Sequence, residues 1–176
     1  NATYDEMRFG FEFGASQVTH TFNAMRPFHH REAGAVGYAL AQDDLATEVI
    51  YDRHHVSKEA MSLLVKCKPL DKLIAVSDST MATGMEPGRT LNMWGVECFT
   101  RKGSVRLKEN DALAGSAITL LDAFQNIAQD FGIELAIRMC CINPRTSIGI
   151  SELPNLYLEM NKNFEITGRR VIQPMR

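Results

Sequence analysis

The stretch VTHTFNAM at residues 18–25 decides how this chain is organised. Val18 and Thr19 favour a β-strand that runs directly into a histidine, and Asn23 ends the extended segment. Parallel α/β folds place their ligand-binding groups at the carboxyl ends of the strands. His20 is therefore a candidate functional residue. The alternative is a core histidine whose ring is satisfied by a backbone carbonyl.

Two further predicted strands end in the same way. The β-branched segment 47–51 runs into a stretch that contains His55, and the continuous apolar segment 73–76 runs into Asp78. A continuous apolar run is typical of a parallel strand buried on both faces. Helical patterns alternate with these strands, so the sequence predicts βα units of a barrel or a doubly wound sheet. The ionisable residues at the strand ends then share one active-site face.

The remaining elements follow from caps and turn residues. We expect a helix over 1–13 capped by Asn1 and a helix capped by Ser57. A β-hairpin is predicted from 93–100 and 104–107, around a turn that contains Gly103. Further along the chain, Ser116 and Asn143 are expected to cap two helices. Segments 156–160, 164–167 and 170–172 are expected to form short β segments.

Composition excludes several functional classes. The chain has 176 residues, 45% of them hydrophobic, and its 19 basic and 21 acidic residues give a net charge of −2. This balance is not a nucleic-acid-binding footprint, and no apolar run reaches the length of a membrane span. No secretory signal is visible, so we expect a cytoplasmic protein. Its four cysteines form no C-x-x-C pair and are expected to be reduced, mostly buried thiols: Cys67, Cys98, Cys140 and Cys141.

His20, His55 and Asp78 are compatible with metal-assisted amide hydrolysis. A catalytic zinc takes histidine and carboxylate ligands, and it makes hydroxide available near neutral pH. A nearby carboxylate can take the proton of the water and pass it to the leaving amine. Spacing alone does not make this case, because the chain has no dense metal motif of the H-E-x-x-H kind.

The motifs resemble one family. The Thr-His-Thr-Phe-Asn-Ala-Met stretch followed by His-His-Arg-Glu at 29–32 resembles the N-acetylglucosamine-6-phosphate deacetylases, which are metal-dependent amidohydrolases. The resemblance covers residues 1 to about 150 and, more loosely, the rest. Further matching motifs are Asp-x-x-His-Val at 52–56, Ser-Asp at 77–78, Leu-Ala-Gly-Ser at 113–116 and Asn-Pro at 143–144.

The resemblance implies an α/β fold, namely the C-terminal portion of a TIM-type (β/α)₈ barrel with strands of a small accessory β domain. It assigns residues 1–150 to the partial barrel and 151–176 to the terminal strands of the β domain. A whole barrel takes about 250 residues, so this chain is too short to close one. The resemblance also implies a homodimer in which the partner completes the phosphate site.

The resemblance also implies roles for single residues. The reaction is hydrolysis of N-acetylglucosamine 6-phosphate, an amino-sugar phosphate, to glucosamine 6-phosphate and acetate, with a divalent metal, zinc or alternatively iron. His20 corresponds to a metal ligand and Asp78 to the catalytic acid–base. Substrate-binding positions are Asn23 and Ala24 for the sugar, Arg31 for the phosphate, His55, and the pocket-lining Leu113, Ala114 and Gly115.

Departures from the family pattern leave the role of Arg53 and the activity of this chain open. The family usually has glycine where Arg53 stands, so this cation either alters the loop or lies against the phosphate. The other expected metal ligands, a histidine and a glutamate, belong upstream of Asn1, so we expect the chain to be inactive alone. Another amidohydrolase, such as a dihydroorotase-like enzyme, is disfavoured by Arg31, because a cyclic amide needs no phosphate clamp. A non-catalytic sugar-phosphate-binding fragment is the third reading.

Overall fold

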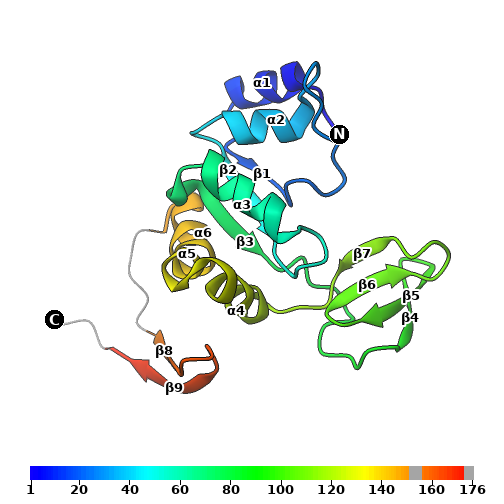
Figure 1. The fold of residues 1–176 in the computed structure, drawn as a ribbon, viewed down its shortest axis with the longest axis vertical. Helices are drawn as coiled ribbons and strands as arrows, with labels where there is room; N and C mark the ends of the chain where they lie inside the picture. The colour runs from blue at the N-terminus through cyan, green and yellow to red at the C-terminus, as the bar shows by residue number, and fades with distance from the viewer. Residues whose placement is uncertain (151–155, 173–176) are drawn as a thin grey trace.

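A three-stranded parallel sheet lies at the centre of the molecule, in the order β1-β2-β3 (Figure 1). The structure is a computed structural model that describes residues 1–150 and 156–172. The strands are β1 (Gln17–Val18), β2 (Ala46–Ile50) and β3 (Leu73–Val76). Because all three run parallel, their carboxyl ends lie along one edge, as the sequence predicted. The first strand is shorter than expected, since His20 has a left-handed backbone with φ of 36° and cannot continue it.

Helices cover this sheet and bury it in a core. Val49 and Leu73 from the strands pack in one cluster with Met61, Ile127 and Met139 from the helices. The helices are α1 (Tyr4–Glu12), α2 (Gly34–Ala41), α3 (Lys58–Cys67) and α4 (Leu120–Phe131), then α5 (Ile133–Ile137), a π-helical turn (Arg138–Ile142) and α6 (Asn143–Ser147), with a 3₁₀ turn at Leu70–Lys72. No helix in the described ranges is long and apolar enough to span a membrane.

Helix capping confirms one of the four expected caps, Ser57, and corrects the other three. Ser57 caps α3 and its hydroxyl accepts a hydrogen bond from the Ala60 amide, as predicted. Asn1 does not cap the first helix, because Thr3 forms a capping box with Glu6 there.

Asn143 is not a cap either. It continues the helical run, and its buried amide donates to the carbonyl oxygens of Leu70 and Leu73 at 2.7 and 2.6 Å. The side chain therefore ties α6 to the start of β3.

A four-stranded antiparallel sheet lies beside the parallel one (Figure 1). It contains the predicted hairpin, but the expected strand 93–100 is divided, because Trp94 and Gly95 form a turn and the hairpin strand begins at Val96. Ser116, expected to cap a helix, is instead a buried residue of its last strand, and Thr119 caps α4. A small core of Ala82, Met93 and Val105 supports this sheet. Its strands are β4 (Thr90–Met93), β5 (Val96–Arg101), β6 (Ser104–Leu107) and β7 (Leu113–Ser116).

A separate hairpin of β8 (Leu156–Met160) and β9 (Ile166–Val171) follows. Of the three short segments expected there, the first is β8 and the other two merge into β9. Residues 151–155 and 173–176 of the predicted second domain lie outside the described residues.

The cysteines are less buried than predicted. All four are free, but only Cys98 is buried, whereas Cys67 and Cys141 are exposed because they lie on helix surfaces. Burial raises the pKa of the half-buried Cys140 thiol to about 12.

Candidate active site

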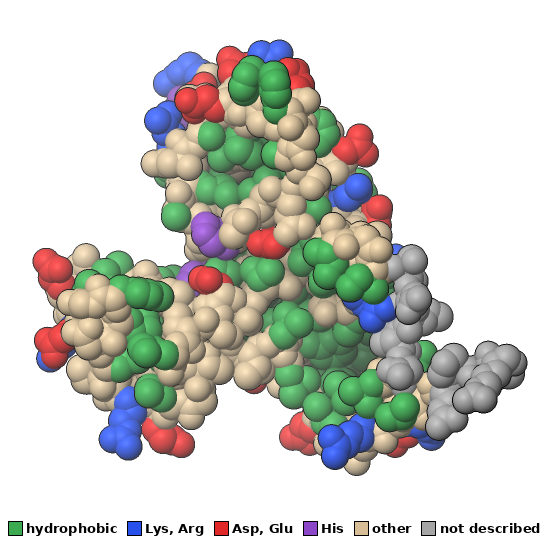
Figure 2. Space-filling view, turned by 180° about the vertical axis from the view of Figure 1, so that it is seen from behind, with side chains coloured by type: hydrophobic (Ala, Val, Ile, Leu, Met, Phe, Trp, Pro, Cys, Tyr) green, Lys and Arg blue, Asp and Glu red, His purple; other side chains and the backbone are tan. Residues whose placement is uncertain are grey.

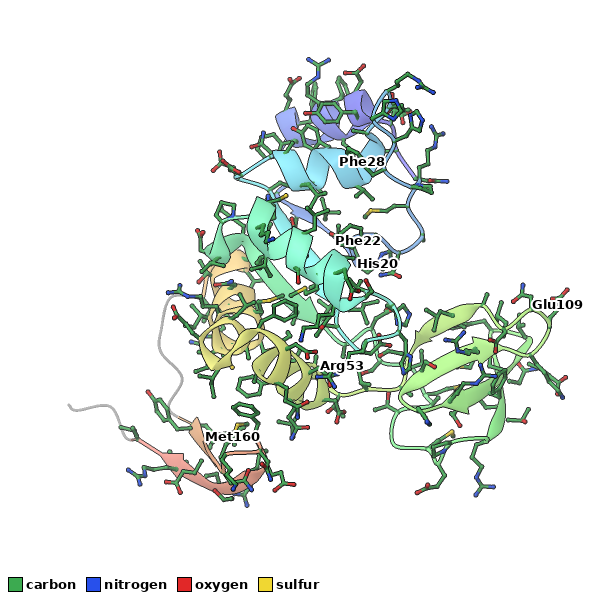
Figure 3. All side chains as sticks on the ribbon, viewed as in Figure 1. His20, Phe22, Phe28, Arg53, Glu109 and Met160 are labelled. Carbon is green, nitrogen blue, oxygen red and sulfur yellow. The ribbon has the colours of Figure 1, made fainter. Side chains whose placement is uncertain are left out.

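The candidate residues follow the carboxyl ends of the parallel strands. His20 comes two residues after β1, and Asp78 two residues after β3. His20 lies beyond the end of β1 (Figure 3). Adjacent strands are about 4.8 Å apart, so the three strand ends span roughly 10 Å. Seen from behind, histidine and acidic side chains gather where this part of the molecule meets the antiparallel sheet (Figure 2).

Backbone strain is concentrated at these strand ends. His20, Ala24 and Asp78 have positive φ values of 36°, 55° and 47°, and Phe22 and Arg53 also lie in the left-handed region. Non-glycine residues adopt this conformation at a cost, and such outliers cluster at functional sites. The loops after β1, β2 and β3 are therefore held in conformations that local sequence preference alone would not select.

His20 has a buried ring nitrogen, Nδ1, for which the described residues offer no hydrogen-bond partner. This observation does not fit the alternative of a core histidine satisfied through that atom by a carbonyl, and it fits one ligand position of a metal site. Within residues 1–150 and 156–172, however, no three histidine, cysteine, aspartate or glutamate side chains form a metal-binding group. The described residues thus supply one ligand candidate and do not complete a site.

His55 is held by a carboxylate that sequence reasoning missed. Asp52 Oδ2 lies 2.7 Å from His55 Nδ1, and Asp52 Oδ1 accepts from the amides of His54 and His55, both at 2.8 Å. Burial by itself raises the pKa of Asp52, but these hydrogen bonds outweigh it and place the pKa below its ordinary value. The i, i+3 spacing of Asp52 and His55 was the available signal.

Asp78 lies against the last strand of the antiparallel sheet. Its carbonyl accepts from the Ser116 amide at 3.0 Å, and its side chain is exposed. A Cβ atom built on Gly115 would lie 3.7 Å from Asp78 Oδ2 and 2.6 Å from Thr80 Cγ2. The structure therefore brings Asp78 together with Gly115, one of the three positions that the resemblance assigns to the sugar pocket. Leu113 and Ala114 precede Gly115 in β7 and are half-buried.

Asn23 and Ala24 lie in the tight turn that follows His20. The Asn23 amide donates to the His20 carbonyl at 3.0 Å, and its side-chain amide donates to the Thr21 carbonyl at 3.5 Å. This turn places both predicted sugar-binding residues directly beside the candidate metal ligand.

Arg31 lies in the exposed loop between β1 and α2. Its guanidinium lies 2.9 Å from the His30 ring in an exposed loop, and no hydrogen bond or ion pair in the described part of the chain links it to His20, His55 or Asp78. The same loop carries Phe28, which lies beside α2 and away from His20 (Figure 3). The predicted phosphate-binding side chain thus bonds within its own loop.

Arg53 faces helix α4, which settles the question left open by its position. Its Nε donates to Asp130 Oδ2 at 2.8 Å and its Nη2 donates to Gln129 Oε1 at 3.1 Å. Tyr51 and Lys58 also donate to the same carboxylate, at 3.0 and 3.2 Å. Burial raises the pKa of Asp130, but these three donors outweigh it and hold the pKa below its usual range. Arg53 therefore anchors the loop to α4.

Exchanging Arg53 tests this account of the loop. Arg53→Ala should lower the free energy of unfolding by about 0.5–1 kcal/mol through the lost, partly exposed ion pair, and it keeps the left-handed strain. Arg53→Gly loses the same pair but relieves a strain of roughly 1–2 kcal/mol at φ 66°. Glycine should therefore give the more stable variant in chemical denaturation. An alanine variant as stable as the glycine variant would contradict the left-handed backbone.

Comparison with known proteins places these features in a family. No protein-family model matches the chain. It is 36% identical over 129 residues to an N-acetylglucosamine-6-phosphate deacetylase of Lysinibacillus sphaericus, covering 73% of this chain and 33% of that protein. It is 34% identical over 133 residues to a putative N-acetylgalactosamine-6-phosphate deacetylase of Escherichia coli K12, covering 74% of this chain and 78% of that protein.

Comparison with solved structures gives the same family as comparison of sequences. The N-acetylglucosamine-6-phosphate deacetylase of Pasteurella multocida superimposes with a TM-score of 0.86 and 33% identity, covering 97% of this chain and 47% of that one. The Mycobacterium smegmatis enzyme, a variant in complex with N-acetyl-D-glucosamine-6-phosphate, gives 0.87 at 25% identity, with 97% and 48% covered. The chain thus spans about half of these structures and a third of the Lysinibacillus relative. By both sequence and structure, the chain belongs to the N-acetylglucosamine-6-phosphate deacetylase family.

Proposed function

We propose that this chain forms part of an enzyme that hydrolyses the acetamide of N-acetylglucosamine 6-phosphate to glucosamine 6-phosphate and acetate. The observation that carries the proposal is the meeting of Asp78, at the end of β3, with Gly115 of β7. This arrangement places an exposed carboxylate beside the β7 backbone, and the missing side chain of Gly115 leaves room for Thr80 and Asp78 to pack against that strand. Family membership does not favour a dihydroorotase-like reaction or a non-catalytic fragment.

Asp78 supplies the proton transfers in this proposal. An ionised carboxylate accepts the proton of the attacking water and then protonates the amine as the carbon–nitrogen bond breaks. Asn23 and Ala24 hold the sugar beside it, and His55 contacts the substrate. His20 would hold one position of a divalent metal, zinc or alternatively iron, which supplies an activated water when bound.

The architecture is part of the proposal. We infer that residues 1–150 form the C-terminal portion of a TIM-type barrel and that 151–176 supply the terminal strands of a small accessory β domain. The parallel order of β1, β2 and β3 supports the first, and the β8–β9 hairpin supports the second. A homodimer is compatible with the exposure of Arg31, because a side chain on the surface can contact the substrate phosphate of a second subunit.

A direct assay tests the reaction. The complete enzyme is incubated with N-acetylglucosamine 6-phosphate, and acetate and primary amine are measured together. The 4-epimer, N-acetylgalactosamine 6-phosphate, is run in parallel, because the Escherichia coli K12 relative carries that substrate in its name. Equal release of acetate and amine supports the proposal. Hydrolysis of the epimer alone would change the substrate, and no release from either sugar would refute it.

Arg31 should select for the phosphate. A planar guanidinium binds phosphate through charge-assisted hydrogen bonds worth roughly 1.5–3 kcal/mol each. Arg31→Ala is therefore expected to reduce kcat/KM for the 6-phosphorylated sugar by about 10–100-fold and to leave the unphosphorylated sugar nearly unchanged. Arg26→Ala, in the same exposed loop, is the matched control. Equal losses on both sugars would show that Arg31 supports the loop and does not read the phosphate.

A further inference from the structure

The strongest unassigned feature is the buried pair of Asp52 and His55. Their side chains are 0% and 5% exposed, and they are joined by a 2.7 Å contact between Asp52 Oδ2 and His55 Nδ1. Asp52 Oδ1 is occupied by the amides of His54 and His55. Both carboxylate oxygens are thus engaged, Oδ1 by two amide donors and Oδ2 by the ring nitrogen, and all of these partners lie in the loop that follows β2.

This arrangement fixes the proton on the His55 ring. A buried carboxylate that accepts two amide N–H bonds through Oδ1 is held in its ionised form, so Oδ2 can only accept a hydrogen bond. Nδ1 must then carry a proton to complete the bond, whatever the charge of the ring. In the neutral imidazole the second nitrogen, Nε2, is left as an acceptor, and the described residues provide no hydrogen-bond partner for it.

We propose that Asp52 is a positioning residue that holds His55 as the Nδ1-protonated tautomer, so that Nε2 accepts a hydrogen bond from a substrate hydroxyl or amide N–H. This inference rests on the proposed function for the identity of the substrate, but not for the tautomer itself. A histidine oriented by a carboxylate in this way keeps both its ring angle and its tautomer, as in other carboxylate–histidine pairs.

A competing account makes Asp52 only a loop cap. In that account, the two bonds from the His54 and His55 amides suffice and the ring contact is incidental. Asp52→Asn separates the two accounts, because an asparagine oxygen can still accept both amides. Its NH₂ group, however, faces His55 Nδ1 as a donor, so the ring proton must move to Nε2. The loop is preserved while the tautomer is reversed.

The test measures tautomer and kinetics in the same full-length enzyme. Nitrogen-15 NMR of the imidazoles should show His55 protonated at Nδ1 in the wild type and at Nε2 in Asp52→Asn, with His54 unchanged. The variant should lose about 10²-fold in kcat/KM, since a wrong tautomer removes the acceptor. Asp130→Asn is the control, because it alters the other carboxylate that anchors this loop without touching His55. It should leave the His55 tautomer unchanged.

Two results would overturn the inference. An unchanged His55 tautomer in Asp52→Asn would show that the carboxylate does not set it, whether or not the enzyme is active. A reversed tautomer with wild-type kcat/KM would show that Asp52 sets the His55 tautomer but that the reaction does not need Nε2 as an acceptor. A wild-type enzyme that hydrolyses neither sugar phosphate refutes the proposed function separately, and the NMR result still decides whether Asp52 sets the tautomer.

Discussion

Replacing Asp78 by asparagine is expected to lower turnover by about 10²–10⁴-fold while leaving substrate affinity nearly unchanged. Asparagine has almost the same shape as aspartate but cannot accept the proton of the attacking water. It also tolerates the left-handed backbone at this position, where φ is 47°, so the contact with Ser116 should survive. The measurement is kcat and KM for N-acetylglucosamine 6-phosphate, with the melting temperature recorded alongside.

Asp111→Asn is a matched control for this variant. Asp111 is also an exposed aspartate with a positive φ, of 59°, and it pairs with Arg101 and Arg106 in the antiparallel sheet. It should change stability slightly and turnover not at all. If Asp78→Asn kept turnover within a few-fold of the wild type, Asp78 would not be the acid–base.

Residues 1–176 on their own are expected to show no amide hydrolysis and only weak zinc binding. His20 is the single ligand candidate that the described residues offer, and they contain no three-residue metal group. A catalytic zinc usually has three protein ligands. In addition, β1 and β3 are the outer strands of the parallel sheet, and open edges of this kind promote association. Metal content, light scattering and acetate release measure the three expectations.

Adding the N-terminal half of a related deacetylase, as one chain or as a complementing fragment, should restore both metal and activity. In the restored enzyme, His20→Asn should lose the metal, whereas His29→Asn, which alters an exposed loop histidine, should retain it. A monodisperse preparation of the 176 residues that carries metal and deacetylates the substrate would disprove this prediction. It would also show that no ligands beyond this chain are needed.

The parallel strands and the residues that follow them could be predicted from local sequence patterns. Segment 73–76 is apolar without alternation because both faces of β3 are covered, and that pattern is local. The cap at Ser57 was predictable for the same reason, since its bond to the Ala60 amide spans only three residues. The family motifs then pointed to His20 and Asp78.

Tertiary structure decided the features that depend on distant partners. Asn143 has the local sequence signal of a helix cap, but its side-chain amide donates to the carbonyl oxygens of Leu70 and Leu73, which are 73 and 70 residues away. Ser116 resembles a cap and becomes a buried strand residue because its amide bonds to the Asp78 carbonyl. Arg53 stands where glycine is usual, and only its bond to Asp130, 77 positions away, explains how a left-handed arginine is held.

In the candidate active site, too, local sequence patterns and distant contacts determine different features. Residue types and motifs identified the candidates, because each motif is a short segment read along the chain. Whether Gly115 lies against Asp78 and whether a carboxylate contacts the His55 ring depend on how the loops pack. Backbone preferences act over a few residues, whereas these contacts form only when the strand ends and the antiparallel sheet come together in the folded chain.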